Sequence, residues 1–222
     1  SYYLLKNRDV AFARRSFAIA AAFGMASIVS VLILGDESGY ETGEVQKVKL
    51  AAIEAEWNTE PAPASFTLFG IPNQEEMRTD YAIKIPYALG IIATRSLDGQ
   101  VTGLKDLKSE HELRVRNGMT AYDLLTKLQS GDKSDDTRAR FDEVKQDLGY
   151  GLLLKRYTNN VTDATDEQIK AAVDDSIPQV APLFFAFRIM VACGMLMLLL
   201  IGLAFYDSTR HKIGERKWLL KA

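Results

Sequence analysis

The stretch "SFAIAAAFGMASIVSVLILG", residues 16–35, contains no charged side chain over 20 positions. A second run, "VAPLFFAFRIMVACGMLMLLLIGLAFY" at residues 180–206, contains one charge, Arg188, over 27 positions. The hydrocarbon core of a bilayer is about 30 Å thick, so a helix needs about 20 apolar residues to cross it. Both runs are therefore predicted to be transmembrane helices. The alternative, a buried core helix of a soluble protein, is uncommon for apolar runs of this length.

Charge is segregated along the chain, although the 222 residues carry a net charge of only −2 and an ordinary apolar content of 47%. Residues 36–179 hold 17 Lys/Arg against 26 Asp/Glu, a net of −9, whereas the short flanks of the two apolar runs are basic. The positive-inside rule then places both ends in the cytoplasm and the acidic middle outside. The predicted order is a basic segment 1–15, a span 16–35, an external segment 36–179, a span 180–206 and a basic segment 207–222.

Several classes of function are disfavoured by composition. No basic patch suggests a nucleic-acid partner. The single cysteine, Cys193, lies within the second apolar run, which excludes an intrachain disulfide and a CxxC metal site. Both ends, "SYYLLK" and "ERKWLLKA", look like parts of further apolar helices. We therefore expect the sequence to be a piece of a larger protein with several membrane spans.

The external segment has the patterns of several short elements. Residues 42–57 are predicted to form one helix with Leu50, Ile53 and Trp57 on one face. "SFTLFGIP" and "YAIKIPYA" have the composition of a hairpin or extended pair, while "LGIIATRS" could be extended or helical. Two amphipathic helices are expected over 104–130 and 135–157, and Thr165 with Gln168 matches a capping box that opens a last helix, ending near Ser176. The fold class is a mainly α membrane protein, in which two transmembrane helices flank a large external α-rich loop with a short hairpin.

Two features of the sequence suggest chemistry, since no nucleotide, zinc-protease or hydrolase motif is present. The first is the charged boundary after residue 35, where a row of carboxylates precedes Lys47 and Lys49. The second is Arg188 with Met190 inside the second run. An ionisable residue in a span is costly and suggests function, although a snorkelling arginine is the simpler alternative. Met190 is either a packing residue or, through its thioether, an axial haem ligand.

Six segments in order, "GDESGYE", "VQKVKLAAIEAEW", "FTLFGIP", "IPYALGIIATRS", "DLGYGLLLKRYT" and "APLFFAFRIMVACG", resemble subunit I of the bacterial cytochrome bd quinol oxidases. The resemblance extends over all 222 residues. It implies that residues 36–179 are the quinol-binding Q-loop between the sixth and seventh membrane helices, of the long type. The charged boundary would then be the place where a lipid-soluble quinol meets water.

The resemblance also implies roles for individual residues. Lys49 and Glu54 match the lysine and glutamate of the quinol site, and Asp36 and Gln46 match positions near it, so these four are the expected substrate-binding residues. Lys49 and Glu54 are also the expected catalytic pair, with Glu54 as proton acceptor and Lys49 as donor to the ring oxygen. Residues five apart on a plain helix are about 140° apart, so we expect a bend between them or a site entered from the side.

The cofactors follow from the resemblance as well. Met190 matches the axial ligand of the low-spin haem b, and Arg188 matches the arginine beside it. The ligands of the high-spin haem b and haem d of the complete subunit would lie outside this chain, so these residues alone are not expected to reduce oxygen. The histidines His111 and His211 both lie outside the apolar runs, so they are not expected to hold a haem as a pair.

The implied partners are a membrane quinol (ubiquinol or menaquinol), subunit II, small subunits of the oxidase and the lipid bilayer, in a bacterial inner membrane with residues 36–179 on the periplasmic side. Two other classes fit the same topology. A two-span receptor with an external sensory domain would show no haem bands in its optical spectrum. A purely structural membrane subunit would not need the pairs Lys49 with Glu54 and Arg188 with Met190.

Overall fold

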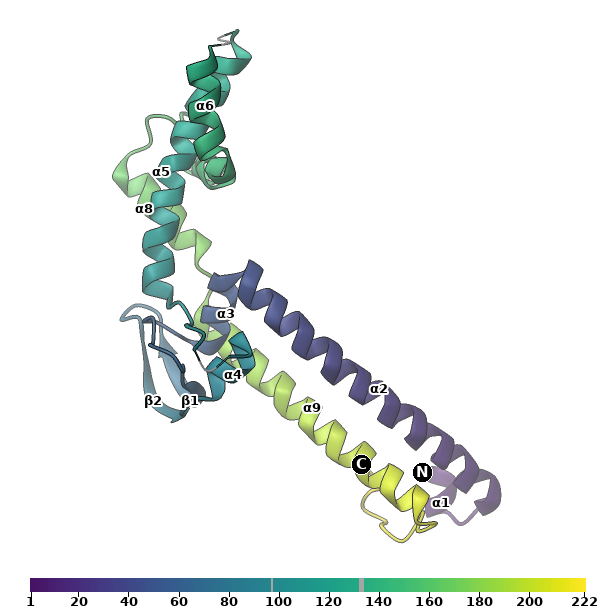
Figure 1. Ribbon diagram of the computed structural model, residues 1–222. Helices are drawn as coiled ribbons and strands as arrows, with labels where there is room; N and C mark the ends of the chain where they lie inside the picture. Colours follow the sequence, from purple (N-terminus) through teal and green to yellow (C-terminus); the bar gives the residue numbers. More distant parts are fainter. Residues whose placement is uncertain (97, 132–133) are drawn as a thin grey trace. The chain divides into compact units, whose positions relative to one another are not determined.

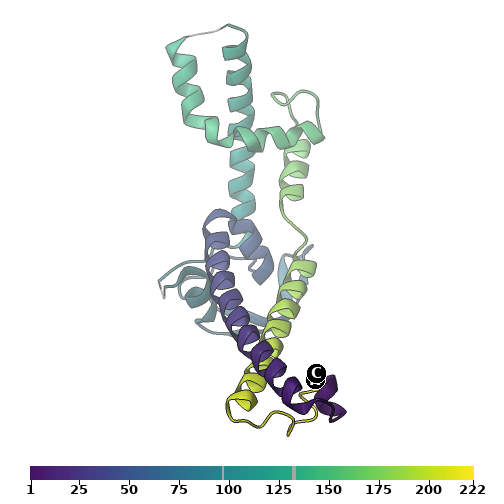
Figure 2. The same cartoon turned by 90° about the vertical axis from the view of Figure 1, so that its right-hand side faces the viewer.

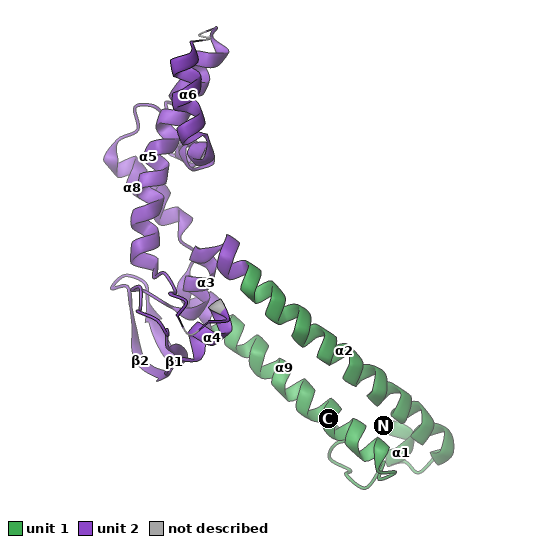
Figure 3. Cartoon of the chain, in the orientation of Figure 1, with its two compact units in different colours: residues 1–41, 185–222 green, residues 42–184 purple. Residues whose placement is uncertain are grey.

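The computed structural model describes residues 1–96, 98–131 and 134–222, and over these residues the chain is mainly helical with one two-stranded sheet. It divides into two compact units (Figure 3). The first comprises Ser1–Glu41 with Phe185–Ala222, and the second comprises Thr42–Phe184. The predicted class, with two long apolar helices on either side of a helical middle region and a hairpin, is confirmed (Figure 1).

The first unit contains the short helix α1 (Tyr2–Leu5) and most of α2 (Val10–Val45) and α9 (Val180–Thr209). Both long helices are apolar enough and long enough to cross a membrane. Each helix extends beyond the predicted span. In α2, the polar residues after position 35 continue the helix because no proline stops it, and α9 continues to Thr209. Gly24 of α2 lies close to Ile201 of α9, since a Cβ on this glycine would be 3.3 Å from the isoleucine Cγ2.

The end of α2 differs from the predicted single helix over 42–57. Gln46 (φ −127°, ψ 58°) interrupts the helix, and a separate helix α3 (Lys47–Glu54) follows and ends at Ala55 in the left-handed conformation (φ 52°). Trp57 lies beyond α3, and its Nε1 donates a hydrogen bond to Thr79 Oγ1 at 2.8 Å. Leu50 and Trp57 pack in different clusters, so they do not share one helix face. Burial of the indole with a satisfied N–H outweighs continuation of the helix.

The predicted extended pair is confirmed as an antiparallel hairpin of β1 (Phe66–Asn73) and β2 (Arg78–Ile85). Phe66 is opposite Ile85, and Asn73 is opposite Arg78. The turn is attached to the start of α9, because Gln74 Nε2 donates to Pro178 O at 3.4 Å and Gln74 Oε1 accepts from Val180 N at 3.0 Å. After the hairpin, the ambiguous stretch 89–96 is mostly helical, as part of α4 (Ala88–Thr94).

The rest of the second unit is helical. It contains α5 (Leu104–Gln129), α6 (Asp135–Val144), η1 (Lys145–Asp147), α7 (Leu148–Leu152), η2 (Leu153–Arg156) and α8 (Asp166–Ser176). In Figure 2, α5 and α6 run side by side. The predicted helix over 135–157 is therefore wrong as one element, because the chain turns after α6 so that α7 crosses α5. The capping box is confirmed: Thr165 Oγ1 accepts from Gln168 N at 3.3 Å, and Gln168 Oε1 accepts from Thr165 N at 3.0 Å.

Two glycines make the crossing of α5 and α7 possible. A Cβ on Gly118 would be 2.3 Å from the backbone nitrogen of Gly151 and 2.4 Å from Asp147 O, closer than any side chain tolerates. The main chains of the two helices are thus in direct contact. This contact fixes where Asp147 and Tyr150, which shortly precede Gly151 in the chain, lie relative to α5.

Three apolar clusters hold the second unit together. The first joins α3 to the starts of α5 and α9 through Ala51, Ala52, Ala55, Trp57, Leu104, Leu107, Val180 and Phe184. The second packs α5 against the residues around η2 and α8 through Val115, Leu154, Val161, Ile169, Ala172 and Val173. The third, formed by Ala64, Leu89, Ala93 and Val101, lies beneath α4. Burial of apolar surface, at roughly 25 cal/mol per Å², stabilises each cluster, and the first cluster fixes the ends of α3, α5 and α9 relative to one another.

Candidate functional site

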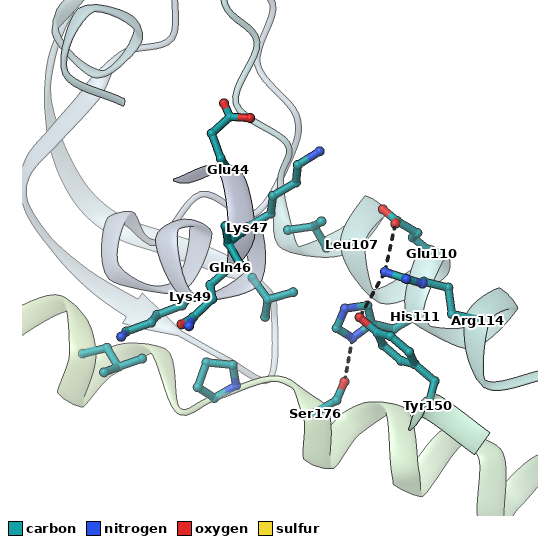
Figure 4. Close-up of a pocket in the computed structure, with 14 residues that line it drawn as sticks. Glu44, Gln46, Lys47, Lys49, Leu107, Glu110, His111, Arg114, Tyr150 and Ser176 are labelled. Carbon is teal, nitrogen blue, oxygen red and sulfur yellow. Dashed lines mark hydrogen bonds and ion pairs between the residues drawn. The ribbon is translucent and has the colours of Figure 1, made fainter. Parts of the chain in front are cut away.

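A cavity of about 640 Å³ lies wholly within the second unit (Figure 4). Its walls come from the last turn of α2, the start of α3, one face of α5, Tyr150 of α7, and the residues between the end of α8 and the first turn of α9. The cavity therefore adjoins the chain positions at which both long apolar helices end or begin. Cavities of this size are large enough for a small organic ligand.

One wall carries polar side chains from the boundary between α2 and α3. Gln46, Lys47 and Lys49 line the cavity there, together with Glu44 (Figure 4). Glu44 belongs to the last turn of α2, and the interruption at Gln46 places Lys47 and Lys49 on the separate short helix α3. Two of the residues expected from the sequence, Gln46 and Lys49, are thus brought together in one cavity.

Glu54 is not among the residues that line this cavity. It is the last residue of α3, is only 4% exposed, and has an interaction partner. We expected either a bend between Lys49 and Glu54 or a site entered from the side, and the bend is absent, because α3 is unbroken from Lys47 to Glu54. The two side chains are therefore directed about 140° apart around the helix axis.

The opposite wall carries an arginine that interacts with Asp147, Tyr150 and, through an ion pair at 3.9 Å, Glu110 (Figure 4). Arg114 of α5 donates from Nε to Asp147 Oδ1 at 2.7 Å and from Nη1 to the Tyr150 hydroxyl at 3.1 Å. Its guanidinium carbon is 4.3 Å from the centroid of the Tyr150 ring. The hydrogen bond to Asp147 raises the pKa of Arg114, so a fixed positive charge is present at the cavity. Asp147 also accepts from Asn117 Nδ2 at 3.0 Å, which orients the carboxylate.

His111 lies one turn before Arg114 on the same helix. Its Nδ1 is 2.9 Å from Ser176 Oγ at the end of α8, and its ring meets the Tyr150 ring edge-to-face with centroids 5.1 Å apart. The half-buried position lowers the pKa of His111; Glu110 raises it and Arg114 lowers it further. The net direction is downward, so the imidazole is neutral at neutral pH.

Three carboxylates, Glu54, Glu56 and Glu60, influence one another near the end of α3. Burial raises the pKa of Glu56 to about 7, and the charges of Glu60 and Glu54 raise it as well, while Lys84 lowers it. Glu56 is 3% exposed. Glu60 accepts from Ser65 Oγ at 2.6 Å and pairs with Lys84. Burial alone would raise the pKa of Glu60, but these hydrogen bonds bring its pKa below the ordinary value.

The other expected site residues belong to the first unit. Asp36 is exposed on α2, and Arg188 is half-buried on α9. Met190 is 61% exposed, so its thioether is accessible to a group outside the chain, as an axial haem ligand must be. Neither α2 nor α9 contains a histidine that could be the second axial ligand. Over the described ranges, no group of three or more His, Cys, Asp or Glu side chains could hold a metal ion.

Sequence reasoning missed His111, Arg114, Tyr150 and Ser176 as lining residues of the cavity. The spacing of three between His111 and Arg114 places both on one face of a helix, which was a usable signal. Tyr150 and Ser176 could not be assigned in this way, because their approach depends on the crossing of α7 over α5 and on the packing of α8.

Comparison with known proteins gives a consistent result. The whole chain, residues 1–222, matches the family described as cytochrome bd terminal oxidase subunit I. It is 46% identical over 221 residues to the cytochrome bd-II ubiquinol oxidase subunit 1 of Escherichia coli (strain K12), covering 100% of this chain and 43% of that protein. It is 25% identical to the cytochrome bd ubiquinol oxidase subunit 1 of Bacillus subtilis (strain 168), covering 100% of this chain and 35% of that protein. The chain thus spans less than half the length of these relatives.

Proposed function

Because the chain belongs to the cytochrome bd terminal oxidase subunit I family, we propose that it forms the quinol-oxidising part of a quinol:oxygen oxidoreductase. The observation that carries this proposal is the cavity that contains Gln46 and Lys49 at the junction of α2 and α3. A quinol ring needs a concave space with a few convergent polar groups, and this cavity provides both. In the intact oxidase, electrons would pass from the quinol to a low-spin haem b and then to oxygen, which is reduced to water.

In the proposed reaction, Lys49 and Gln46 bind the ring oxygens of the quinol. An ammonium group donates hydrogen bonds to an oxygen and stabilises negative charge as the hydroxyl proton leaves. Glu54 is proposed as a proton-accepting carboxylate. Since it is buried at the far end of α3, its proton has to arrive along the side of that helix and not from direct contact with a quinol in the cavity.

The haem-side residues have a separate role in the proposal. Met190 would provide one axial sulfur ligand to the low-spin haem b, and Arg188, two residues earlier, would lie near the haem propionates or ring edge. A haem with a thioether ligand supplies a one-electron acceptor of raised potential. Asp36 would contribute to the quinol site from the membrane boundary.

The partners and location follow from the same proposal. The quinol is drawn from the bilayer that α2 and α9 would cross, with residues 36–179 on the periplasmic side of a bacterial inner membrane. Subunit II and the small subunits would complete the oxidase. The high-spin haem b and haem d would be held by parts of the subunit beyond these 222 residues.

The proposal is tested in the intact oxidase with Lys49→Ala and Glu54→Ala. Each is expected to lower quinol turnover at least tenfold while the haem spectrum stays nearly normal, because binding and proton transfer are lost but the spans are untouched. Lys127→Ala is a matched control, since Lys127 is exposed and pairs with Asp123 one turn away on the same helix. Loss of haem with normal turnover per remaining haem would assign a structural role to these residues. Membranes without haem bands would instead favour a receptor.

A further inference from the structure

We propose that His111 is the base that takes the first proton from the quinol and that Ser176 is its positioning residue. This inference rests on the proposed function of the cavity and adds a catalytic residue to it. It depends on the hydrogen-bond pattern around the imidazole, the charges that face it and its place in the cavity wall.

The hydrogen bonds of Ser176 determine which nitrogen of His111 carries the proton. The hydroxyl has one hydrogen, and Oγ donates it to Val173 O at 2.6 Å. At 2.9 Å from Nδ1, the same oxygen can therefore only accept. The neutral imidazole is thus the Nδ1–H tautomer, and Nε2 carries the lone pair. Among the described residues, the hydrogen-bond partner of His111 is Ser176 at Nδ1, so Nε2 is available to a ligand in the cavity.

Protonation at Nε2 requires no rearrangement of this pattern. The Nδ1–H bond to Ser176 persists when the ring becomes an imidazolium, because both nitrogens are then donors. A base that is already oriented in its ground state loses little free energy to reorganisation during proton transfer. The edge-to-face contact with Tyr150 holds the ring plane from the other side.

Burial and the charged groups around His111 together determine its protonation state before the reaction, and the net effect keeps the imidazole neutral. Those on its own helix are Glu110 and Arg114, and those from the elements packed against it or lining the same cavity are Asp147, Tyr150, Lys47, Lys49, Glu44 and the ion pair of Lys108 with Asp174. Arg114 and burial lower the pKa of His111, and Glu110 opposes them. A neutral imidazole with an available ring nitrogen can accept a proton, as a general base must.

The proton transfer balances as follows. The O–H bond of one quinol hydroxyl breaks, an N–H bond forms at Nε2, and the products are an imidazolium and a quinolate anion. Lys49 and Arg114 on the cavity walls stabilise the anion. The low-spin haem proposed for the intact oxidase would accept the two electrons one at a time, and the second hydroxyl proton would pass along α3 to Glu54, the carboxylate proposed above as proton acceptor. Glu110, whose side chain is 54% exposed, then accepts the imidazolium proton and releases it to solvent.

The test is His111→Gln in the intact oxidase, measured with a short-chain quinol and with a one-electron donor that carries no proton. Glutamine keeps a polar side chain of similar reach but cannot be protonated. We expect kcat with quinol to fall at least tenfold at pH 7, KM to change less than threefold, and turnover with the proton-free donor to remain normal. The acidic limb of the pH profile, which reports protonation of His111, should disappear.

Ser176 gives a second, milder test. Ser176→Ala should lower kcat with quinol severalfold, and Ser176→Thr, which restores the hydroxyl, should recover it. An unchanged kcat and acidic limb in His111→Gln would overturn the inference, as would an equal loss with both donors. If Lys49→Ala also leaves quinol turnover unchanged, the proposed function of the cavity fails too. If Lys49→Ala alone loses turnover, the cavity binds quinol and only the role of His111 is wrong.

Discussion

At the residue scale, the second unit contains a carboxyl group in an unfavourable position. Glu56 is almost fully buried, and its neighbours Glu60 and Glu54 add negative charge, so its pKa is raised from 4.5 to about 7. Only Lys84, which pairs with Glu60, opposes this effect. A buried group in such surroundings destabilises the fold when it is ionised.

Glu56→Gln is therefore expected to stabilise the second unit at high pH. Because the folded-state pKa is raised, the native state binds the proton more tightly than the unfolded chain between pH 4.5 and about 7, and stability falls with rising pH over that window. The amide removes this loss, which is on the order of 3 kcal/mol above pH 7. Amide hydrogen exchange of residues 51–57 measures it. Equal exchange rates in the variant and the parent at pH 8 would contradict the prediction. At pH 4.5 the two rates should converge, which is the internal control.

Met190→Leu is expected to abolish or shift the low-spin haem b band of the intact oxidase and to lower its potential. A thioether stabilises reduced iron, and leucine cannot ligate. Leucine is close to methionine in volume, so the change in packing alone should cost under about 1.5 kcal/mol. An optical redox titration measures both effects, with Met195→Leu on the same helix as a control for volume. An unchanged spectrum would mean that Met190 only packs.

At the element scale, sequence patterns predicted those elements whose signals are local. Three signals depend only on neighbouring residues: the apolar runs, the composition of the two hairpin segments, and the capping box of Thr165 with Gln168. The corresponding elements are all present in the structure. The interruption at Gln46 and the division of 135–157 were not predictable. They depend on burial of Trp57 under the hairpin and on the glycine contact between α5 and α7, which involve residues distant in sequence.

The candidate site shows the same limit. The resemblance pointed to Gln46 and Lys49, which line the cavity, but no sequence pattern connected them with His111, Arg114, Tyr150 and Ser176. Those four residues come from three helices that meet only after α7 crosses α5 and α8 packs back. Their approach is a property of tertiary packing and not of any one segment.

The hairpin turn offers a prediction for one element. Proteolytic cleavage within residues 74–77 is expected to lower quinol turnover of the intact oxidase severalfold and to leave haem content unchanged. The side chain of Gln74 joins the turn to Pro178 and Val180 at the start of α9, and Pro178 lines the cavity. Cleavage near residue 130, between α5 and α6, is the control and should have a smaller effect on quinol oxidation. The reverse order would show that the site depends mainly on α5 and α6.

At the scale of the whole molecule, the two units differ in the surfaces that they expose. The first unit consists mainly of two helices with exposed apolar surfaces, such as Phe23 at 75% exposed, and the second has three apolar clusters of its own. A helix that is apolar all round is stable in lipid, whereas the clusters of the second unit require water outside them. The boundary between the two solvents should therefore lie near Glu41 on α2 and Phe185 on α9.

Single-cysteine labelling tests this arrangement in cells. In a Cys193→Ser background, Asp98→Cys is expected to react with a membrane-impermeant reagent from the periplasmic side only, and Lys212→Cys from the cytoplasmic side only. The prediction follows from the basic flanks of the two spans, since a long segment such as 36–179 translocates largely regardless of its own charge. Reaction of both positions from one side would exclude a two-span topology.

The contact between Gly118 and Gly151 has a consequence for the genetics of this protein. Any side chain larger than hydrogen at either position would push α7 away from α5, and Tyr150 and Asp147 would move with it. An unbiased screen for loss of respiration on quinol should therefore recover Gly118 variants alongside variants of the polar residues in the cavity. Such an allele would retain every charged and hydrogen-bonding group of the site, so its phenotype would report lost alignment rather than lost chemistry. Compensating second mutations would be expected in α7, where a shifted main chain can be re-accommodated, and not at Lys49 or His111.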